Sequence, residues 1–183
     1  YERLDHLRCC LDSILLSSEH FDDVIITDDG SCDATVSKLK EMIRSYSFPI
    51  RHIWQEKKGF RNAAARNNGI RHAKGDYLIF FDCDFLVLPQ TIPQHLKLAK
   101  HGKFIAGGYK NTDEGSTREA FQTAITVDFL NRLDRRFPER PLIKTHRRFI
   151  KRTLLIQLHL AAPQKQSLGG HFSIHKKDLA RVN

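Results

Sequence analysis

The sequence predicts an α/β protein with a mostly parallel central sheet flanked by helices. Segments with apolar residues at helical spacing alternate with short apolar runs across residues 3–81. The runs VIIT and YLIFF lack polar alternation, which is typical of strands buried on both faces of a parallel sheet. Both runs end in acids, and such sheets bind ligands outside the carboxyl ends of their strands. These observations predict a ligand site there.

The first half of the chain supplies the alternating elements. Leucine and isoleucine recur at helical spacing near the start, and DVIITDDG is a β-branched run that ends in acids and glycine. Asp33 suits the N-cap of the helix that follows. This order predicts right-handed crossovers between parallel strands. The expected elements are a helix over 3–17, a strand within 23–30, a helix over 33–46, a strand over 50–54, an alanine-rich helix over 60–73 and a strand over 77–81.

The pattern loosens after Pro89. Residues 134–148 contain two prolines and fit no regular element. We therefore expect one domain with two functional halves, residues 1–88 and 89–183. The expected elements of the second half are a helix over 91–100, a strand within 103–108, a helix over 117–133 and a helix over 149–160.

Composition is typical of a soluble globular domain, with 183 residues, 40% hydrophobic and 28% charged. The chain begins on Tyr1 inside an expected helix and ends on Asn183, so we expect a single domain truncated at both ends. Within these residues we expect no signal peptide, and there is no run near the roughly 18 apolar residues that span a bilayer, although the missing ends could contain a targeting or membrane segment. The four cysteines show neither metal-ligand spacing nor a disulfide framework, which favours a cytoplasmic location.

The net charge of +9 is concentrated in residues 134–152, which hold eight Lys or Arg against two acids. Such a segment binds nucleic acid, an anionic membrane surface or phosphorylated substrates, or is simply a solvated face. Only Phe137 and Phe149 could stack on bases there, so we do not expect nucleic acid binding.

Asp82 and Asp84 follow the strand YLIFF directly. Side chains two apart on an extended chain point the same way, and paired carboxylates cost energy unless cations or donors hold them. Carboxylates suit Mg²⁺ or Mn²⁺, and Mg²⁺ is typically held by one or two of them together with substrate phosphates. The pattern predicts such a site, with an ordinary acidic turn as the alternative.

Asp28 and Asp29 end the other apolar run, before Gly30-Ser31. An acid-rich strand-to-helix loop with a purely structural role explains them equally well. Arg66 lies in the alanine-rich helix, and its fork of donors suits a phosphate or a base edge. An exposed helical arginine is an equally good interpretation on local grounds.

Three stretches together resemble the family 2 glycosyltransferases with the A-type nucleotide-sugar fold, which is Rossmann-like. They are DVIITDDGSCDAT, GFRNAAARNNGIRHAKGDYLIFFDCDF and LGGHFSIHKKDLARVN. The resemblance covers most of residues 2–88 and returns at 168–183, where the chain is similar to the start of a galactosyltransferase-type C-terminal segment. It implies a nucleotide-sugar-binding half, 1–88, and an acceptor-side half, 89–183, incomplete at its C-terminus.

The resemblance also implies a role for each matching residue. Asp28 or Asp29 would contact the nucleotide base, Arg66 would lie near the base or diphosphate, and Asp82 would face the ribose. Asp84 would ligate Mn²⁺ or Mg²⁺ bridging the diphosphate.

The last matching stretch would face the sugar end of the site. Gly169, Gly170 and His171 would approach the donor sugar or acceptor. His171 and His175 are further candidates for diphosphate or metal contact, with a packing or surface histidine as the alternative.

Sugar transfer from a nucleotide diphosphate leaves negative charge on the departing phosphate, where a metal would act as a Lewis acid. The family inverts the anomeric centre by direct displacement, which implies a base that deprotonates the acceptor hydroxyl. The family's base is a carboxylate expected soon after Val182-Asn183, so the general base is expected beyond Asn183 and the catalytic residue is unknown. The apolar first strand of the family is likewise expected before Tyr1.

Three functions remain open. The leading one is a metal-dependent inverting glycosyltransferase, with a UDP-sugar donor favoured and a hydroxyl of a cell-surface glycan or glycolipid, as in polysaccharide or lipopolysaccharide biosynthesis, as acceptor. Its basic segment 134–152 would touch anionic lipid at the inner face of the membrane. The second is a nucleotidyltransferase, which would need a Gly-rich phosphate loop upstream. The third is a non-catalytic module that binds a nucleotide-sugar or a glycan.

Overall fold

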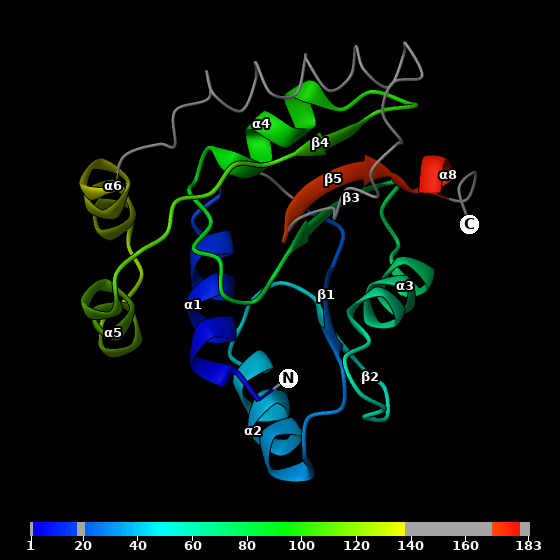
Figure 1. The fold of residues 1–183 in the computed structure, drawn as a ribbon, viewed down its shortest axis with the longest axis horizontal. Coiled ribbons are helices and arrows are strands. Elements are labelled where there is room, and N and C mark those ends of the chain that lie inside the picture. Colours follow the sequence, from blue (N-terminus) through cyan, green and yellow to red (C-terminus); the bar gives the residue numbers. More distant parts are fainter. Residues whose placement is uncertain (1, 18–20, 138–169, 180–183) are drawn as a thin grey trace, which may run out of the picture.

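The computed structural model describes residues 2–17, 21–137 and 170–179 (Figure 1). Most elements predicted from the sequence are present, with ends that differ by a few residues. In chain order they are α1 (Leu4–Leu15), β1 (Val24–Asp28), α2 (Asp33–Ile43), β2 (Ile50–Trp54), α3 (Asn62–His72), β3 (Tyr77–Phe81), α4 (Thr91–Leu98), β4 (Phe104–Ala106), α5 (Glu114–Gln122), α6 (Val127–Arg136), β5 (His171–His175) and α8 (Lys176–Leu179).

The first β-α-β unit has the predicted parallel arrangement. Strands β1 and β2 pair in parallel, so that Asp28 lies opposite Trp54 at their carboxyl ends. Helix α3 packs closely against β1, because a Cβ on Gly69 would lie 2.8 Å from the Thr27 side chain. This close packing brings α3, which carries Arg66, to the strand ends.

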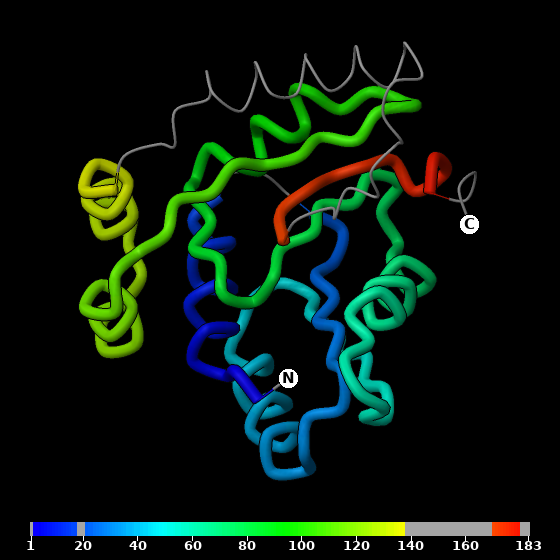
Figure 2. The backbone as a smooth tube through the Cα atoms, viewed as in Figure 1, coloured from blue at the N-terminus to red at the C-terminus, as the bar shows by residue number. Residues whose placement is uncertain are grey.

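The second sheet is antiparallel throughout the described residues. Its order is β3-β5-β4, and β5 pairs antiparallel with both neighbours. The backbone tube in Figure 2 shows β5 returning beside β3 although the two are far apart in sequence. The α/β class is confirmed, but the described ladders comprise one parallel and two antiparallel pairs. Strand β5 accounts for the difference, because sequence analysis did not expect a strand over 171–175.

Three local expectations need correction or lie outside the description. Asp33 is the first residue of α2, and Cys32 is its N-cap, with the Glu2 carboxylate accepting from the Cys32 backbone N–H at 2.7 Å. The helix expected over 117–133 is two helices, because Thr126 caps α6 by accepting from the Phe129 N–H. The helix expected over 149–160 lies outside the described residues.

Helix α1 organises the core. Its consecutive residues Cys9, Cys10 and Leu11 are all at most 4% exposed, and each belongs to a different hydrophobic cluster. Neighbouring side chains on a helix point about 100° apart, so three in a row reach three sides. Cys9 packs toward α5 and α6, Cys10 toward α4, and Leu11 toward β1 and α2.

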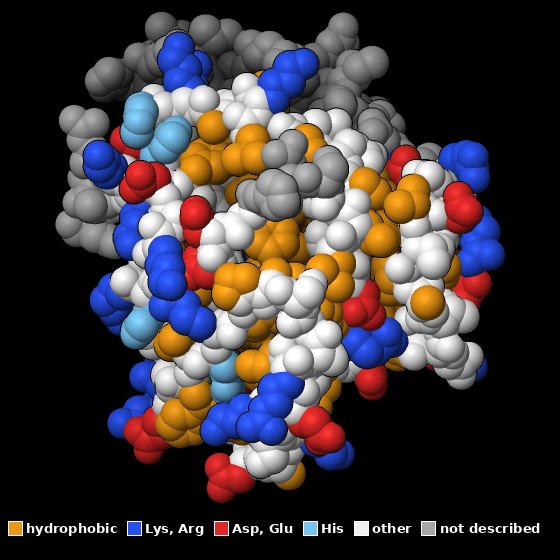
Figure 3. All heavy atoms as spheres, turned by 180° about the vertical axis from the view of Figure 1, so that it is seen from behind, with side chains coloured by type: hydrophobic (Ala, Val, Ile, Leu, Met, Phe, Trp, Pro, Cys, Tyr) orange, Lys and Arg blue, Asp and Glu red, His pale blue; other side chains and the backbone are white. Residues whose placement is uncertain are grey.

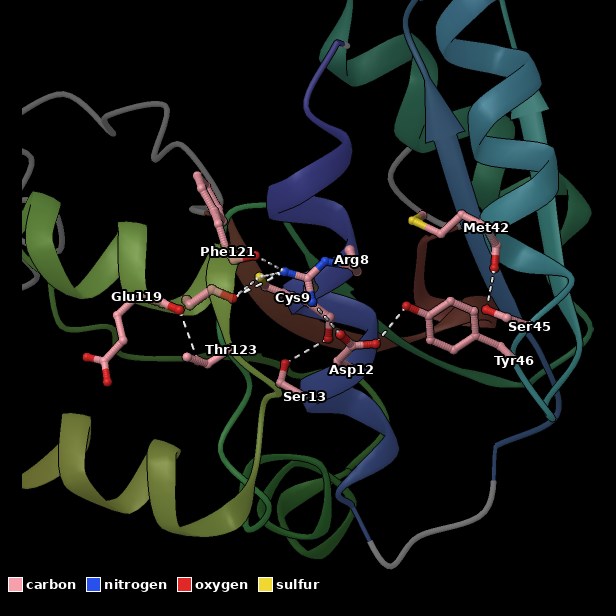
Figure 4. Close-up of polar contacts among 12 residues, drawn as sticks. Arg8, Cys9, Asp12, Ser13, Met42, Ser45, Tyr46, Glu119, Phe121 and Thr123 are labelled. Carbon is pink, nitrogen blue, oxygen red and sulfur yellow. Dashed lines mark hydrogen bonds and ion pairs between the residues drawn. The ribbon is translucent and has the colours of Figure 1, made fainter.

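Polar contacts fix α1 to its neighbours (Figure 4). Arg8 donates to the carbonyls of Ala120 and Phe121, at 3.2 and 2.9 Å, near the C-terminal end of α5. Cationic donors are favourable there because the last carbonyls of a helix lack partners. Asp12 pairs with Arg8 at 3.0 Å and accepts from the Tyr46 hydroxyl at 2.8 Å, which links α1 to the segment after α2.

Apolar side chains are exposed on part of the surface. Figure 3 shows them gathered near the middle of the face seen from behind, with charged side chains toward its edges. Patches of this kind are uncommon on isolated soluble domains. The large apolar residues that are more than a third exposed are Leu15, Trp54, Phe60, Leu96, Leu98, Phe104, Tyr109 and Val127.

Candidate functional site

The acids after β3 each meet an arginine. Asp82 Oδ1 accepts from Arg66 Nη2 at 2.8 Å, and Asp84 Oδ2 accepts from Arg3 Nη1 at 3.2 Å. The two carboxylate side chains are 42% and 46% exposed, so both remain accessible to a ligand. The structure thus brings together the predicted residues Arg66 and Asp82, and it adds Arg3, which sequence analysis did not single out.

The start of β5 forms one wall of this site. Gly170 O accepts from the Asp82 backbone N–H at 2.7 Å. A Cβ on Gly170 would lie 2.3 Å from Asp82 Oδ2 and 2.9 Å from the Phe85 ring, so any side chain there would require these groups to shift. The guanidinium of Arg66 stands 5.5 Å from the ring centroid of Phe172. Gly170 thus lies against Asp82, and Gly169 lies outside the described residues.

Asp28 is 4% exposed and closes the turn after β1. Its Oδ1 accepts from both the N–H and the hydroxyl of Ser31, at 3.0 and 2.7 Å, and its Oδ2 lies 3.1 Å from His52 Nε2. Gly30 turns the chain with φ of 88°, and its backbone approaches Lys57 too closely for any side chain. These contacts match the structural interpretation of the acid loop.

Asp29 holds the segment after β2 over the strand ends. Its carboxylate accepts from the Arg61 backbone N–H at 2.8 Å and from Gln55 Nε2 at 2.7 Å. These hydrogen bonds, led by the one from Arg61, hold the pKa of Asp29 below its usual range. Lys57 lies 3.8 Å away and adds positive charge. Asp29 therefore stays ionised and shapes the loop over 55–61.

Trp54 is a candidate ligand contact that sequence analysis missed. It ends β2 opposite Asp28, its indole N–H donates to Ser31 O at 3.0 Å, and it is 49% exposed. An aromatic ring that is held by one hydrogen bond and half exposed suits stacking on a nucleobase. Two features of the sequence could have identified it. Trp54 is the single tryptophan of the chain, and it ends an expected parallel strand.

The histidines of β5 lie at its two ends. His171 pairs with Phe81 beside the acids, whereas His175 pairs with Tyr77 at the opposite end of β3. His171 is 8% exposed, and burial lowers its pKa. Its ring stacks on Phe81 with centroids 4.7 Å apart. The structure thus brings His171, but not His175, to the acids.

The acids at the end of β3 fit a metal ion that substrate oxygens complete. Among residues 2–17, 21–137 and 170–179, no group of three or more His, Cys, Asp or Glu side chains could hold a metal by itself. Two accessible carboxylates, Asp82 and Asp84, nevertheless match the one or two protein carboxylates that typically hold Mg²⁺ together with substrate phosphates. The donor set is therefore compatible with Mn²⁺ or Mg²⁺ shared with a diphosphate.

Only the beginning of the basic segment 134–152 is described. Asp134 pairs with Lys110 at 2.7 Å, and Arg136 pairs with Asp113 at 2.6 Å. The remaining residues of that segment lie outside the described ranges. In the part of the chain that the structure describes, no helix is long and apolar enough to cross a membrane.

Sequence comparison links the chain to known glycosyltransferases. The profile of Glycosyl transferase family 2 matches residues 1–159. A validoxylamine A glucosyltransferase of Streptomyces hygroscopicus subsp. jinggangensis is 39% identical over 72 residues, 38% of this chain and 16% of that protein. The hyaluronan synthase of Pasteurella multocida is 42% identical over 76 residues, 40% of this chain and 7% of that protein.

Two further relatives extend the match. A dolichol-phosphate mannosyltransferase of Pyrococcus furiosus is 30% identical over 115 residues, 62% of this chain and 31% of that protein. The chain thus matches less than a third of the length of each of these three curated relatives. A mannosyltransferase of Pyrobaculum calidifontis, solved in complex with GDP-Man and Mn²⁺, has the same fold, with a TM-score of 0.50, 19% identity and coverage of 68% of this chain and 36% of that one.

Proposed function

The chain belongs to glycosyl transferase family 2, and from this premise we propose that the whole protein transfers a sugar from a nucleotide-diphosphate donor to an acceptor hydroxyl. The observation that carries the proposal is the accessible carboxylate pair after β3, where Asp82 is held by Arg66 and abutted by Gly170. Family membership favours this function over a nucleotidyltransferase or a non-catalytic module.

The donor nucleotide would lie across the carboxyl ends of β1, β2 and β3. Asp82 would contact the ribose, and Arg66 would lie beside the base or diphosphate. The half-exposed Trp54, which lies opposite Asp28, supports stacking of the base at the Asp28–Asp29 end of the site. UDP is the favoured nucleotide, and GDP is the main competitor because the structural neighbour was solved with GDP-Man.

The sugar and the acceptor hydroxyl would lie next to the start of β5. Gly169, Gly170 and His171 are the residues proposed for this end. The relatives named above are a glucosyltransferase, a glycan synthase and a lipid-phosphate mannosyltransferase, so the proposed acceptor class is a glycan or glycolipid. We place the general base beyond Asn183.

A divalent ion held by Asp84, Mn²⁺ or Mg²⁺, would stabilise the negative charge of the departing diphosphate when bound. The residues of the protein would then bind and orient the nucleotide-diphosphate donor. Arg66 places positive charge next to Asp82, and Arg3 does so next to Asp84. An acceptor hydroxyl still needs a base to take its proton as the new bond forms.

The basic segment 134–152 supports a peripheral position at the cytoplasmic face of the membrane. Anionic lipid attracts clustered Lys and Arg by about 1 kcal/mol per residue near the surface. Such a position would bring a glycolipid acceptor to the site.

Thermal shift with UDP, GDP, dTDP and CMP, with and without Mn²⁺, tests the proposal. A ligand at about a hundred times its dissociation constant should stabilise the fold by roughly 2.7 kcal/mol. We expect one diphosphate to stabilise the protein only with Mn²⁺, and Asp84→Ala to abolish this effect. Asp128→Ala, which alters an exposed aspartate in the first turn of α6, is the matched control and should keep it. A folded full-length protein that responds to no nucleotide would reject the proposal.

A further inference from the structure

A hydrogen-bonded chain of four polar side chains connects β3, the middle and first residues of β5, and α4. The hydroxyls of Tyr77 and Ser173 lie 2.6 Å apart, and Ser173 Oγ lies 2.5 Å from His95 Nδ1. His95 Nε2 then lies 2.7 Å from His171 Nε2, and His171 Nδ1 lies 3.4 Å from Gly108 O. Because each of these polar atoms lies within hydrogen-bonding distance of the next, the direction of one hydrogen bond constrains the direction of its neighbours.

The contact between the two histidines relates their tautomers. Of the two Nε2 atoms, 2.7 Å apart, one must donate and the other accept, so neutral His95 and His171 carry their protons on different ring nitrogens. Two orders of hydrogen bonds satisfy this. In one, His171 donates from Nδ1 to Gly108 O at 3.4 Å, His95 donates from Nε2, and Ser173 donates to His95 Nδ1. In the other, the Tyr77 hydroxyl donates to His95 O at 3.3 Å and accepts from Ser173, His95 donates from Nδ1, and His171 donates from Nε2. Both orders assign opposite tautomers to the two histidines.

Burial keeps the two histidines of this hydrogen-bonded chain neutral. Ser173 is 0% exposed, His95 is 3% and His171 is 8%. Burial, followed by the neighbouring His171 ring, lowers the pKa of His95 to about 4. A neutral imidazole whose two nitrogens are both bonded has one fixed orientation, which suits a positioning role.

The residues that flank His171 touch the candidate site. Gly170 accepts from the Asp82 N–H at 2.7 Å, and Phe172 lies under the Arg66 guanidinium. The His171 ring is confined by Gly107, where a Cβ would lie 2.0 Å from Nδ1. A shift of the His171 ring would therefore move the backbone on both of its sides.

We propose that His95 is a positioning residue of the transferase site. Acting through His171, it holds Gly170 and Phe172 against Asp82 and Arg66. The inference rests on the proposed function, because Asp82 and Arg66 are the residues assigned there to the nucleotide. The hydrogen bonds of His95 lead to Ser173, Tyr77 and His171, so it acts on the site from outside it.

The tautomers can be read directly by ¹⁵N NMR of histidine-labelled protein, with His95→Gln used for assignment. We expect both rings to be neutral, with one histidine protonated at Nδ1 and the other at Nε2. Two rings of the same tautomer, or rings averaging between tautomers, would overturn the ordered chain. This measurement needs no nucleotide, so it stands apart from the proposed function.

Binding of UDP and of GDP, each with Mn²⁺, tests the positioning role through quenching of the Trp54 fluorescence. His95→Leu should weaken binding about tenfold or more, because small displacements of binding groups are costly. His95→Gln, whose amide can still bond His171, should recover part of the loss. Ile92→Ala is the matched control, since Ile92 is buried on the same helix in a cluster with Cys10, Ile14 and Val87. It should bind within about twofold of the unaltered protein.

The outcomes separate the two proposals. If the unaltered protein binds a nucleotide and folded His95→Leu binds equally tightly, the positioning role is wrong and the proposed function stands. If Ile92→Ala weakens binding as much as His95→Leu, the effect is loss of packing and the positioning role is again wrong. Should His95→Leu not fold, Ser173→Ala replaces it, because it removes one hydroxyl from the chain. If the unaltered protein binds none of UDP, GDP, dTDP and CMP, the proposed function and the positioning role fail together, whatever the tautomers.

Discussion

At the scale of single residues, the site is organised by arginine–aspartate pairs. Arg3 and Arg66 lie far apart in the sequence. Arg3 pairs with Asp84, and Arg66 pairs with Asp82, two residues away from Asp84. A positive charge therefore stands at each carboxylate before any ligand arrives. A metal ion at Asp84 has to compete with Arg3 for the same oxygens.

Removing Arg3 should increase the affinity for Mn²⁺ in the absence of nucleotide. The Arg3–Asp84 pair is about half exposed, and such pairs contribute up to about 1 kcal/mol, so Arg3→Gln should tighten Mn²⁺ binding up to about fivefold. Electron paramagnetic resonance of free Mn²⁺ measures this. Arg118→Gln, which removes an exposed arginine paired with Glu114, should leave the affinity unchanged. Weaker binding by Arg3→Gln would contradict the competition.

Replacing Asp28 should destabilise the fold whether or not a nucleotide binds. Asp28→Ala leaves the Ser31 N–H and His52 without their buried acceptor, at a cost of about 1–3 kcal/mol. Urea denaturation measures the free energy of unfolding. Asp128→Ala, at an exposed position, should change it little. Equal stability of the two variants would mean that Asp28 has no structural role.

Acid should unfold the protein partly through His95. The folded-state pKa of about 4 lies below the unfolded value near 6.5, so between these values the unfolded state binds more protons. The stability contributed by neutral His95 is present above pH 6.5 and is lost as the pH falls toward 4. Urea denaturation at pH 7 and pH 5 should differ by about 2 kcal/mol more in the unaltered protein than in His95→Gln. Parallel pH curves for the two proteins would show that His95 titrates normally.

At the scale of elements, β5 joins the two halves of the molecule. It pairs with β3 from the first half and with β4 from the second, and its first residues abut Asp82. Sequence analysis identified the stretch GGHFSIHKK through its family resemblance but not as a strand. Five residues between glycines and lysines form a recognisable strand only when their partners, far away in the sequence, are known.

A methyl group at Gly170 should test the contact between β5 and Asp82. Gly170→Ala would place a Cβ 2.3 Å from Asp82 Oδ2, so we expect a loss of about 1–3 kcal/mol in stability and loss of Mn²⁺-dependent nucleotide binding. Calorimetry and Trp54 fluorescence measure the two effects. Gly108→Ala is the control, since a Cβ there meets nothing within 4 Å. Normal nucleotide binding by Gly170→Ala would show that the contact is dispensable.

The helix expected over 117–133 shows how a local signal can outweigh periodicity. Apolar spacing continues across the segment, yet the chain leaves the helix at Thr123 and re-enters it after Thr126. The hydroxyl of Thr126 accepts from the Phe129 N–H at 3.1 Å and so starts a new helix. At the start of α2 a distant residue outweighs the local signal. Asp33 is not the N-cap, and the Glu2 carboxylate accepts from the N–H of the N-cap residue Cys32.

At the scale of the whole molecule, α1 is the shared packing element. Three consecutive residues of α1 enter three clusters, and its polar face binds α5 and the segment after α2. The acids after β3 therefore rest on a core that contacts both halves of the chain.

The basic segment 134–152 should mediate contact between the whole protein and lipid. We expect replacement of Arg147, Arg148, Lys151 and Arg152 by Gln to abolish binding to vesicles that contain anionic lipid, because clustered positive charge supplies the attraction. Vesicle sedimentation measures this, with vesicles of neutral lipid as the reference. Unchanged binding by the fourfold variant would reject the membrane contact.

The sequence by itself determined the alternating helices and strands of residues 4–81 and the position of both acid pairs at strand ends. It could do so because periodicity, burial and turn residues are local properties of the chain. The tertiary structure alone decided the partners of those acids. Arg3 at Asp84, Gly170 at Asp82 and His95 at His171 all join residues that are more than 70 positions apart. No local pattern specifies such contacts, because they depend on where the start of α1 and strand β5 lie relative to the end of β3.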